Sequence, residues 1–171
     1  MIDALPVWLD LESRLLKAAR PVETAFILVN LTHALVPYRQ AALWSPDDGL
    51  VALSGTATAE AGSPFALWLV RLFRALAPRD DLPLTFGAAD LPPAVAGEWG
   101  EWLPAHALAL RAGDEILLFA RDQPFDLSEV GILERLAELG GLSRRALAPR
   151  RGRWRLPRGG RARWAAAALI L

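Results

Sequence analysis

The sequence predicts an α+β fold in which an antiparallel sheet is flanked by helices. Two pairs of short apolar runs are each joined by a turn sequence, as in β-hairpins, whose strands are antiparallel neighbours. Other segments repeat apolar residues at the spacing of one helical face. Strands and helices do not alternate along the chain as a doubly wound parallel sheet would require. With 171 residues, the chain has room for one domain and an appendage.

The N-terminal part of the chain predicts two helices. Apolar residues from Leu5 to Ala19 fall on one helical face, and this helix ends near Pro21. Because proline suits the first turn of a helix, Pro21 also marks the start of a second helix. That helix continues through Phe26 and stops before Pro37.

Two hairpins supply most of the predicted sheet. The first covers residues 39–54 and turns at a segment that contains Pro and Gly. The second covers residues 105–120, and the apolar run 116–119 indicates a strand that is buried on both faces. Residues 82–86 predict one further short strand.

Two more helices begin at residues that are typical of helix caps. Ser63-Pro64 places an N-cap serine before a first-turn proline. Asp126 and Glu129 have the spacing of a capping box, and Gly140-Gly141 predicts the end of that last helix. Between these helices, residues 88–104 are rich in Pro and Gly and predict a long structured loop.

Charge divides the chain into two parts. Residues 1–143 contain all 19 acidic residues and 10 of the 19 basic ones, so this part has a formal charge of −9. Residues 144–163 contain nine Arg and no acid. We therefore expect a folded domain over 1–143 and an Arg-rich tail over 144–163.

Composition excludes several classes of function. Apolar residues make up 53% of the chain, which excludes general disorder. The absence of Cys excludes disulfide scaffolds, cysteine zinc sites and thiol catalysis, and two His leave little for a metal site. Ser54, His106 and Asp90 can be combined into a hydrolase triad, but no nucleophile-elbow sequence accompanies them. We expect a non-enzymatic domain without a cofactor or metal.

The end of the chain resembles the beginning of a transmembrane helix. Trp164 and seven apolar residues follow the Arg cluster, whereas a complete span needs about 20 residues. Residues 164–171 are therefore expected to start a single span of the inner (plasma) membrane, and the positive-inside rule places residues 1–163 in the cytoplasm. The residues expected to contact anionic lipid are Arg150, Arg151, Arg153, Arg155, Arg158, Arg161, Arg163 and Trp164.

Two alternatives apply to this tail. Charge runs are commonly solvated, so the first alternative is a disordered basic tail with an apolar end. The second alternative is a nucleic-acid-binding tail, in which the arginines contact phosphates and Trp154 and Trp164 stack on bases. No recognised nucleic-acid-binding motif surrounds them, so we expect no nucleic-acid partner.

Several strings of the sequence together resemble a known family. They are Val29-Asn30-Leu31-Thr32 leading into 35–41, Ser54-Gly55 before Ser63-Pro64-Phe65, Trp102-Leu103-Pro104, and the basic tail that ends in an apolar run. This combination is similar to the GAF-like cytoplasmic N-terminal domain of HlyD-type periplasmic adaptor (membrane fusion) proteins. The resemblance implies a sensor or docking domain of a single-pass efflux or secretion adaptor, with a pump as partner. The alternative is a ligand-sensing GAF domain of a membrane-bound signalling protein.

The resemblance also implies where a small molecule would bind. In GAF-like folds a loop often covers the ligand cavity, and Trp99 and Trp102 lie in the predicted loop 88–104. We expect Trp99, Trp102 and His106 to line a pocket for an unidentified small molecule. The alternatives are that the two tryptophans anchor the loop and that His106 is a packing residue. The sequence does not determine the oligomeric state, and a homo-oligomer is compatible with it.

Overall fold

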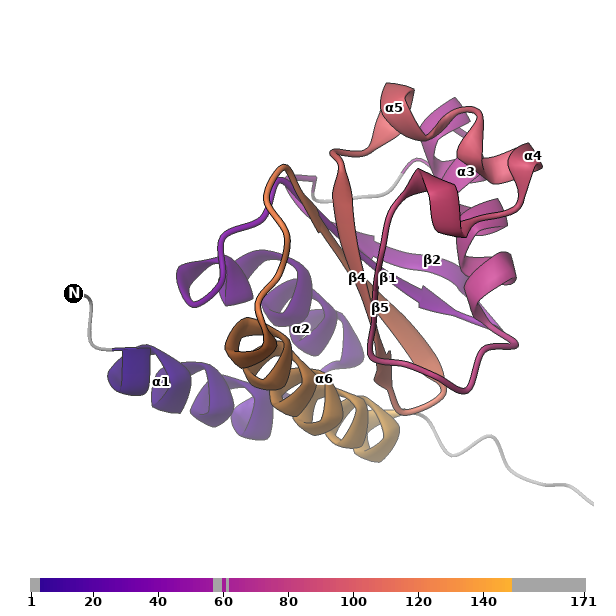
Figure 1. Cartoon of the computed structure of the whole chain (residues 1–171). Helices are drawn as coiled ribbons and strands as arrows, with labels where there is room; N and C mark the ends of the chain where they lie inside the picture. The colour runs from indigo at the N-terminus through magenta and orange to yellow at the C-terminus, as the bar shows by residue number, and fades with distance from the viewer. Residues whose placement is uncertain (1–3, 57–59, 61, 149–171) are drawn as a thin grey trace, which may run out of the picture.

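The computed structural model describes residues 4–56, 60 and 62–148. Five antiparallel strands form one sheet in the order β2-β1-β5-β4-β3, and helices cover both of its faces (Figure 1). The predicted α+β class, with an antiparallel sheet flanked by helices, is thus confirmed. The strands are β1 (Gln40–Ser45), β2 (Gly49–Leu53), β3 (Leu84–Phe86), β4 (His106–Ala112) and β5 (Glu115–Arg121).

Both predicted hairpins are present, and their inner strands form the centre of the sheet. Gly49 begins β2 directly after the β1–β2 turn, and Gly113 lies in the β4–β5 turn; both have a positive φ, which favours glycine. Strand β5 pairs with β1 on one side and with β4 on the other. Residues 116–119 are fully buried, as the apolar run predicted.

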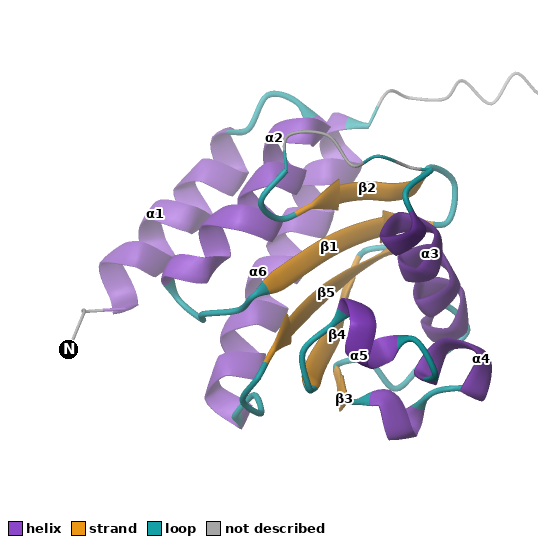
Figure 2. Ribbon diagram, turned by 90° about the horizontal axis from the view of Figure 1, so that it is seen from above, coloured by secondary structure: helices purple, strands orange, loops and turns teal. Residues whose placement is uncertain are grey.

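One face of the sheet is covered by two helical segments, with a third helix outside them. Next to the sheet lie α6 (Leu127–Leu147) and the segment that starts with α2 (Pro21–Phe26). That segment continues as a π-helix, Ile27–Leu31, and a 3₁₀ turn, Thr32–Ala34. Helix α1 (Ala4–Lys17) packs on α6 and on the π-helix from outside and lies farther from the sheet (Figure 2).

The opposite face of the sheet carries an aromatic core under α3 (Pro64–Leu76). Two four-residue helices, α4 (Pro93–Ala96) and α5 (Trp99–Trp102), and a 3₁₀ turn, Ala88–Asp90, complete this layer. The prediction of a long loop over 88–104 was therefore wrong in part. These short helices form because they bury apolar side chains such as Val95 against α3.

The last helix is longer than predicted. It continues through Gly140-Gly141 to Leu147, so the predicted glycine stop was wrong. A Cβ on Gly141 would lie 2.5 Å from both Ala112 C and Gly113 N, so this glycine allows the helix to contact the β4–β5 turn. As a result Arg144, which we expected in the tail, belongs to α6.

The predicted helix caps are confirmed. The Ser63 hydroxyl accepts a hydrogen bond from Ala66 N at 3.2 Å. Asp126 and Glu129 form the reciprocal capping box at the start of α6. Glu129 also pairs with Arg121 of β5, which lowers the pKa of its carboxyl and fastens the helix start to the sheet.

A buried tyrosine, Tyr38, makes hydrogen-bond contacts with the helical segment that follows α2. The Tyr38 hydroxyl donates to Val29 O at 2.9 Å and lies 3.0 Å from Thr32 Oγ1. Burial raises the pKa of Tyr38 to about 12. Val29 lies within the π-helix, so this hydrogen bond links the non-α turn to the start of the sheet.

The stability of the protein should therefore fall at alkaline pH. An unfolded tyrosine ionises near pH ~10, and the folded state holds its proton to a higher pH. Stability from this group is complete below pH ~10 and declines as the pH rises toward the folded pKa of about 12. Tyr38 is the chain's sole tyrosine, so tyrosinate absorbance reports it directly. We expect Tyr38→Phe to remove this part of the decline; a folded-state midpoint near pH ~10 would contradict the burial argument.

Candidate functional site

Trp99 is a core residue in the structure. Its indole Nε1 donates to Pro104 O at 2.9 Å, and its ring meets Trp68 and Phe86 edge to face, with centroids 6.1 and 5.7 Å away. These contacts satisfy the polar end of the side chain and bury the rest. They are the contacts of a packing residue that anchors the 88–104 segment.

Trp102 lies at the edge of the same layer. Its ring stacks on Phe65 with a centroid distance of 5.6 Å, and it lines a polar pocket of about 360 Å³ that includes Gln40 and Asp122. Within the described part of the chain, its buried Nε1 has no hydrogen-bond partner of good geometry. The indole nevertheless faces Glu98, whose pKa is lowered mainly by the hydrogen bond from Arg71 and further by Trp102.

His106 lines a different pocket from Trp102. It opens β4 and borders a space of about 460 Å³ together with Phe86 and Phe125. The structure thus places Trp99 in the core and separates Trp102 from His106. The three residues predicted to share one pocket do not converge on one.

The structure does not bring together Ser54, His106 and Asp90, the three residues of the possible hydrolase triad. Ser54 follows β2, whereas His106 lies in β4, three strands away, which corresponds to roughly 14 Å across a sheet. Ser54 Oγ instead accepts from Ala41 N at 2.7 Å, and Asp90 accepts from Gly87 N at 2.9 Å. No cluster of metal-ligating side chains occurs within residues 4–56, 60 and 62–148.

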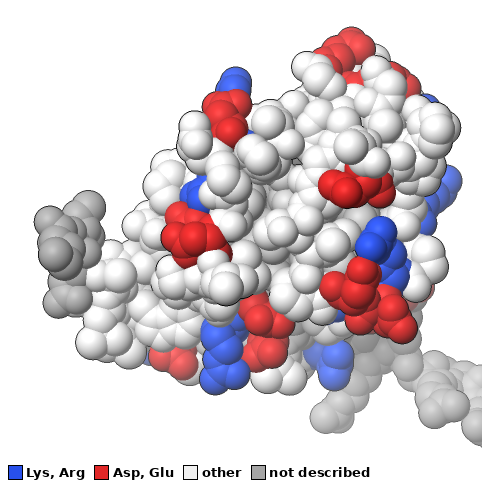
Figure 3. All heavy atoms as spheres, in the orientation of Figure 1, with Lys and Arg blue, Asp and Glu red and all other residues white. Residues whose placement is uncertain are grey.

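The residues predicted to contact the membrane, Arg150 to Trp164, lie outside the described residues. Among the helices that are described, none has the length and apolar character needed to cross a bilayer. On the face shown in Figure 3, acidic side chains form several separate groups, many beside a basic side chain. The negative charge of the body is therefore spread over this face.

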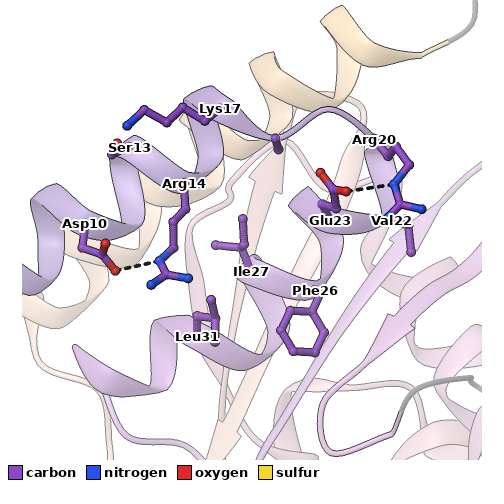
Figure 4. Close-up of a pocket in the computed structure, with 11 residues that line it drawn as sticks. Asp10, Ser13, Arg14, Lys17, Arg20, Val22, Glu23, Phe26, Ile27 and Leu31 are labelled. Carbon is purple, nitrogen blue, oxygen red and sulfur yellow. Dashed lines mark hydrogen bonds and ion pairs between the residues drawn. The ribbon is translucent and has the colours of Figure 1, made fainter.

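An open groove lies between α1 and α2, with a volume of about 640 Å³ (Figure 4). Sequence reasoning missed it. Helix α1 contributes one wall, and α2 with the π-helix contributes the other. The residues that line it are Asp10, Ser13, Arg14, Lys17, Ala18, Arg20, Val22, Glu23, Phe26, Ile27 and Leu31.

Apolar side chains on the α2 wall remain open to solvent. Val22 is 62% exposed and Phe26 is 53% exposed, although both belong to an otherwise well-buried helix. They are four residues apart and so lie on the same helical face. Large apolar side chains that line a groove in this way are typical of an interaction surface.

Charged side chains form the rim of the groove. Arg14 Nε donates to Asp10 Oδ2 at 2.7 Å, and Arg20 Nε donates to Glu23 Oε1 at 2.8 Å (Figure 4). The pKa of Glu23 is lowered first by the hydrogen bond from the Ala19 amide and then by the one from Arg20. Lys17 lies on the same rim without an ion pair to any described residue.

Comparisons of the chain with protein-family models, with curated proteins and with solved structures gave no match.

Proposed function

We propose that this chain is a non-enzymatic, GAF-like sensor or docking domain held at the cytoplasmic face of the inner membrane, within a single-pass HlyD-type efflux or secretion adaptor. The charge division of the sequence carries the proposal. An acidic body precedes seven Arg between residues 150 and 163, and Trp164 with an apolar run follows them. Cations, an interfacial aromatic and hydrocarbon in this order match the entry of a chain into a bilayer.

The folded part supports docking more than catalysis or ligand sensing. A five-stranded antiparallel sheet with helices on both faces is compatible with a GAF-like domain. The predicted ligand pocket is divided, because Trp99 fills the core while Trp102 and His106 border separate spaces. The open groove beside Phe26 offers a surface for a protein partner instead, and a pump subunit is the partner that the adaptor assignment suggests.

Vesicle binding tests the membrane contact. The full chain should co-sediment with vesicles of phosphatidylglycerol and phosphatidylcholine, and added salt should weaken the binding, because each engaged cation contributes at most about 1 kcal/mol and is screened. Replacing Arg150, Arg151, Arg153, Arg155, Arg158, Arg161 and Arg163 by Gln should abolish it. A matched variant with Arg74→Gln and Arg135→Gln on the folded body should bind as the parent does.

Two results would overturn the proposal. One is equal binding by the tail variant and the parent. The other is recovery of the natural gene product in the cytosolic fraction after cell lysis. Tighter binding of the chain to duplex DNA than to the anionic vesicles would favour the nucleic-acid alternative instead.

A further inference from the structure

We propose that Arg150 and Arg151, the first arginines after α6, bind back to the folded body in a pocket at the end of that helix. The pocket has a volume of about 480 Å³ and lies where the β1–β2 turn, the β4–β5 turn and the end of α6 meet. In Figure 1, α6 ends beside the β4–β5 turn. The contact is made within the chain itself, and only its consequence for lipid binding rests on the proposed function.

The first step is the charge of the pocket. Four carboxylates and two guanidiniums line it, and they belong to Asp47, Asp48, Asp114, Glu115, Arg144 and Arg145. The lining therefore has a formal excess of two negative charges. A concave surface lined mainly by one sign of charge attracts groups of the opposite sign. Two further cations would balance this pocket, and Arg150 and Arg151 supply two.

The second step is the position of the two cations that the pocket already contains. Arg144 Nη2 donates to Glu115 Oε1 at 2.8 Å, and Arg144 also donates to the Pro21 carbonyl. A Cβ on Gly113 would lie 3.0 Å from Arg145 Nη2, so the Arg145 guanidinium reaches over the β4–β5 turn. An arginine at the end of α6 thus already uses a pocket carboxylate as its partner, and the next arginines of the chain extend this mode of contact.

The third step is the short length of chain between the pocket and these arginines. Ala148 lines the pocket, and Arg150 and Arg151 follow it by two and three residues. Consecutive Cα atoms are ~3.8 Å apart, so the two arginine Cα atoms lie at most about 7.6 and 11.4 Å from that of Ala148. Such a short tether gives an effective concentration of about millimolar or more, so individually weak ion pairs suffice to hold the segment.

Other occupants match the pocket less well. In the part of the chain that the structure describes, no three acidic or histidine side chains converge closely enough to hold a metal ion. Carboxylates that are distributed over two turns suit separate guanidiniums better than one small cation. An anionic headgroup is disfavoured by the negative excess of the lining.

The contact divides the tail into two parts. Arg150 and Arg151 are held by the carboxylates of the body. The five arginines between residues 153 and 163 and Trp164 then meet anionic lipid first. Lipid has to displace the carboxylates of the pocket before it can engage all seven arginines, so the pocket lowers the affinity of the chain for a membrane.

Zero-length cross-linking of the full chain without lipid tests the contact directly. Arg150→Lys/Arg151→Lys introduces two amines, which a carbodiimide couples to carboxylates in direct contact with them. Lys17 on α1 is the one lysine of the parent chain, so the new cross-links are easily recognised. Mass spectrometry should place them on Asp47, Asp48 and Asp114.

A matched variant separates a specific contact from general attraction to an acidic body. Arg158→Lys/Arg161→Lys carries the same two changes farther along the tail and should give few cross-links to the pocket. Cross-links of the first variant that are spread over carboxylates outside the pocket, or equal coupling of both variants to the pocket, would rule out the proposed contact.

Two variants of the body leave the arginines unchanged. The pocket variant is Asp47→Asn/Asp48→Asn/Asp114→Asn. The control variant removes three negative charges from α1, α5 and the residue after β5 and is Glu12→Gln/Glu101→Gln/Asp122→Asn. Far-ultraviolet circular dichroism confirms that each variant is folded.

Limited trypsin digestion of these variants measures how firmly the segment is held. Cleavage after Arg150 and Arg151 follows the population in which they are released, so it should be at least about fivefold faster in the pocket variant than in the parent. Cleavage after Arg158 should be the same in both, and the control variant should behave as the parent. Equal cleavage after Arg150 and Arg151 in all three chains contradicts the proposal.

Vesicle binding then separates failure of this contact from failure of the proposed function. The pocket variant should bind vesicles of phosphatidylglycerol and phosphatidylcholine more tightly than the control variant, by about threefold or more. Cross-linking to the pocket in a chain that binds no vesicles would support the contact and count against the membrane assignment. Vesicle binding that is equal in the two variants, without cross-linking to the pocket, would do the reverse.

Discussion

Replacing Gly141 by alanine is expected to destabilise the protein strongly. The added Cβ would lie 2.5 Å from Ala112 C and from Gly113 N, and both are backbone atoms that cannot rotate away. Helix α6 would have to move off the β4–β5 turn, at a cost of about 1–3 kcal/mol or more. Urea denaturation followed by circular dichroism should show a lower midpoint for Gly141→Ala.

Two glycines of the same helix serve as controls for this prediction. A Cβ on Gly131 meets nothing within 4 Å, so Gly131→Ala should raise stability by about 0.5–1 kcal/mol through helix propensity. A Cβ on Gly140 meets the end of the Leu28 side chain, which can shift, so Gly140→Ala should fall between the other two. Equal stability of the Gly141 and Gly131 variants would show that the helix and the turn are not in close contact.

The ion pair between Arg144 and Glu115 should be the most important pair in the described structure. Both side chains are only 11% exposed, Arg144 Nη2 donates to Glu115 Oε1 at 2.8 Å, and Arg144 Nη1 donates to Pro21 O at 2.5 Å. Arg144→Leu leaves a buried carboxylate and a carbonyl without partners, so we expect a loss of about 3–5 kcal/mol in unfolding free energy.

A double-mutant cycle separates the pair from the rest of the packing. Glu115→Leu with Arg144→Leu should cost clearly less than the sum of the two single changes, because no buried charge is then left alone. Arg135 and Glu138 form an exposed pair in the same helix, and Arg135→Leu should change stability by less than about 0.5 kcal/mol. Additive losses in the cycle would mean that Arg144 and Glu115 act independently.

The elements that depend on local chemistry could be predicted from the sequence. The caps at Ser63 and Asp126, the hairpins and the buried strand β5 all follow from short patterns. Gly140-Gly141 misled the prediction because glycine has two uses in helices. It ends many of them through a positive φ, but here it allows close contact with the sheet, and only the three-dimensional packing distinguishes the two.

The candidate site depended on tertiary packing and was therefore harder to predict. Trp99 and Trp102 are close in sequence, yet one points into the core and the other lies at its edge. The groove beside Phe26 exists because α1 packs outside α2 without covering it. The sequence does contain one signal for it: Val22 and Phe26 lie on one helical face, next to the buried face of α2.

The way α6 is fastened has a mechanical consequence. Its last two turns are joined to β5 through Glu115, to the start of α2 through the Pro21 carbonyl, and to the β4–β5 turn through Gly141. A pulling force applied at the end of α6 would thus reach the sheet and the helical layer together.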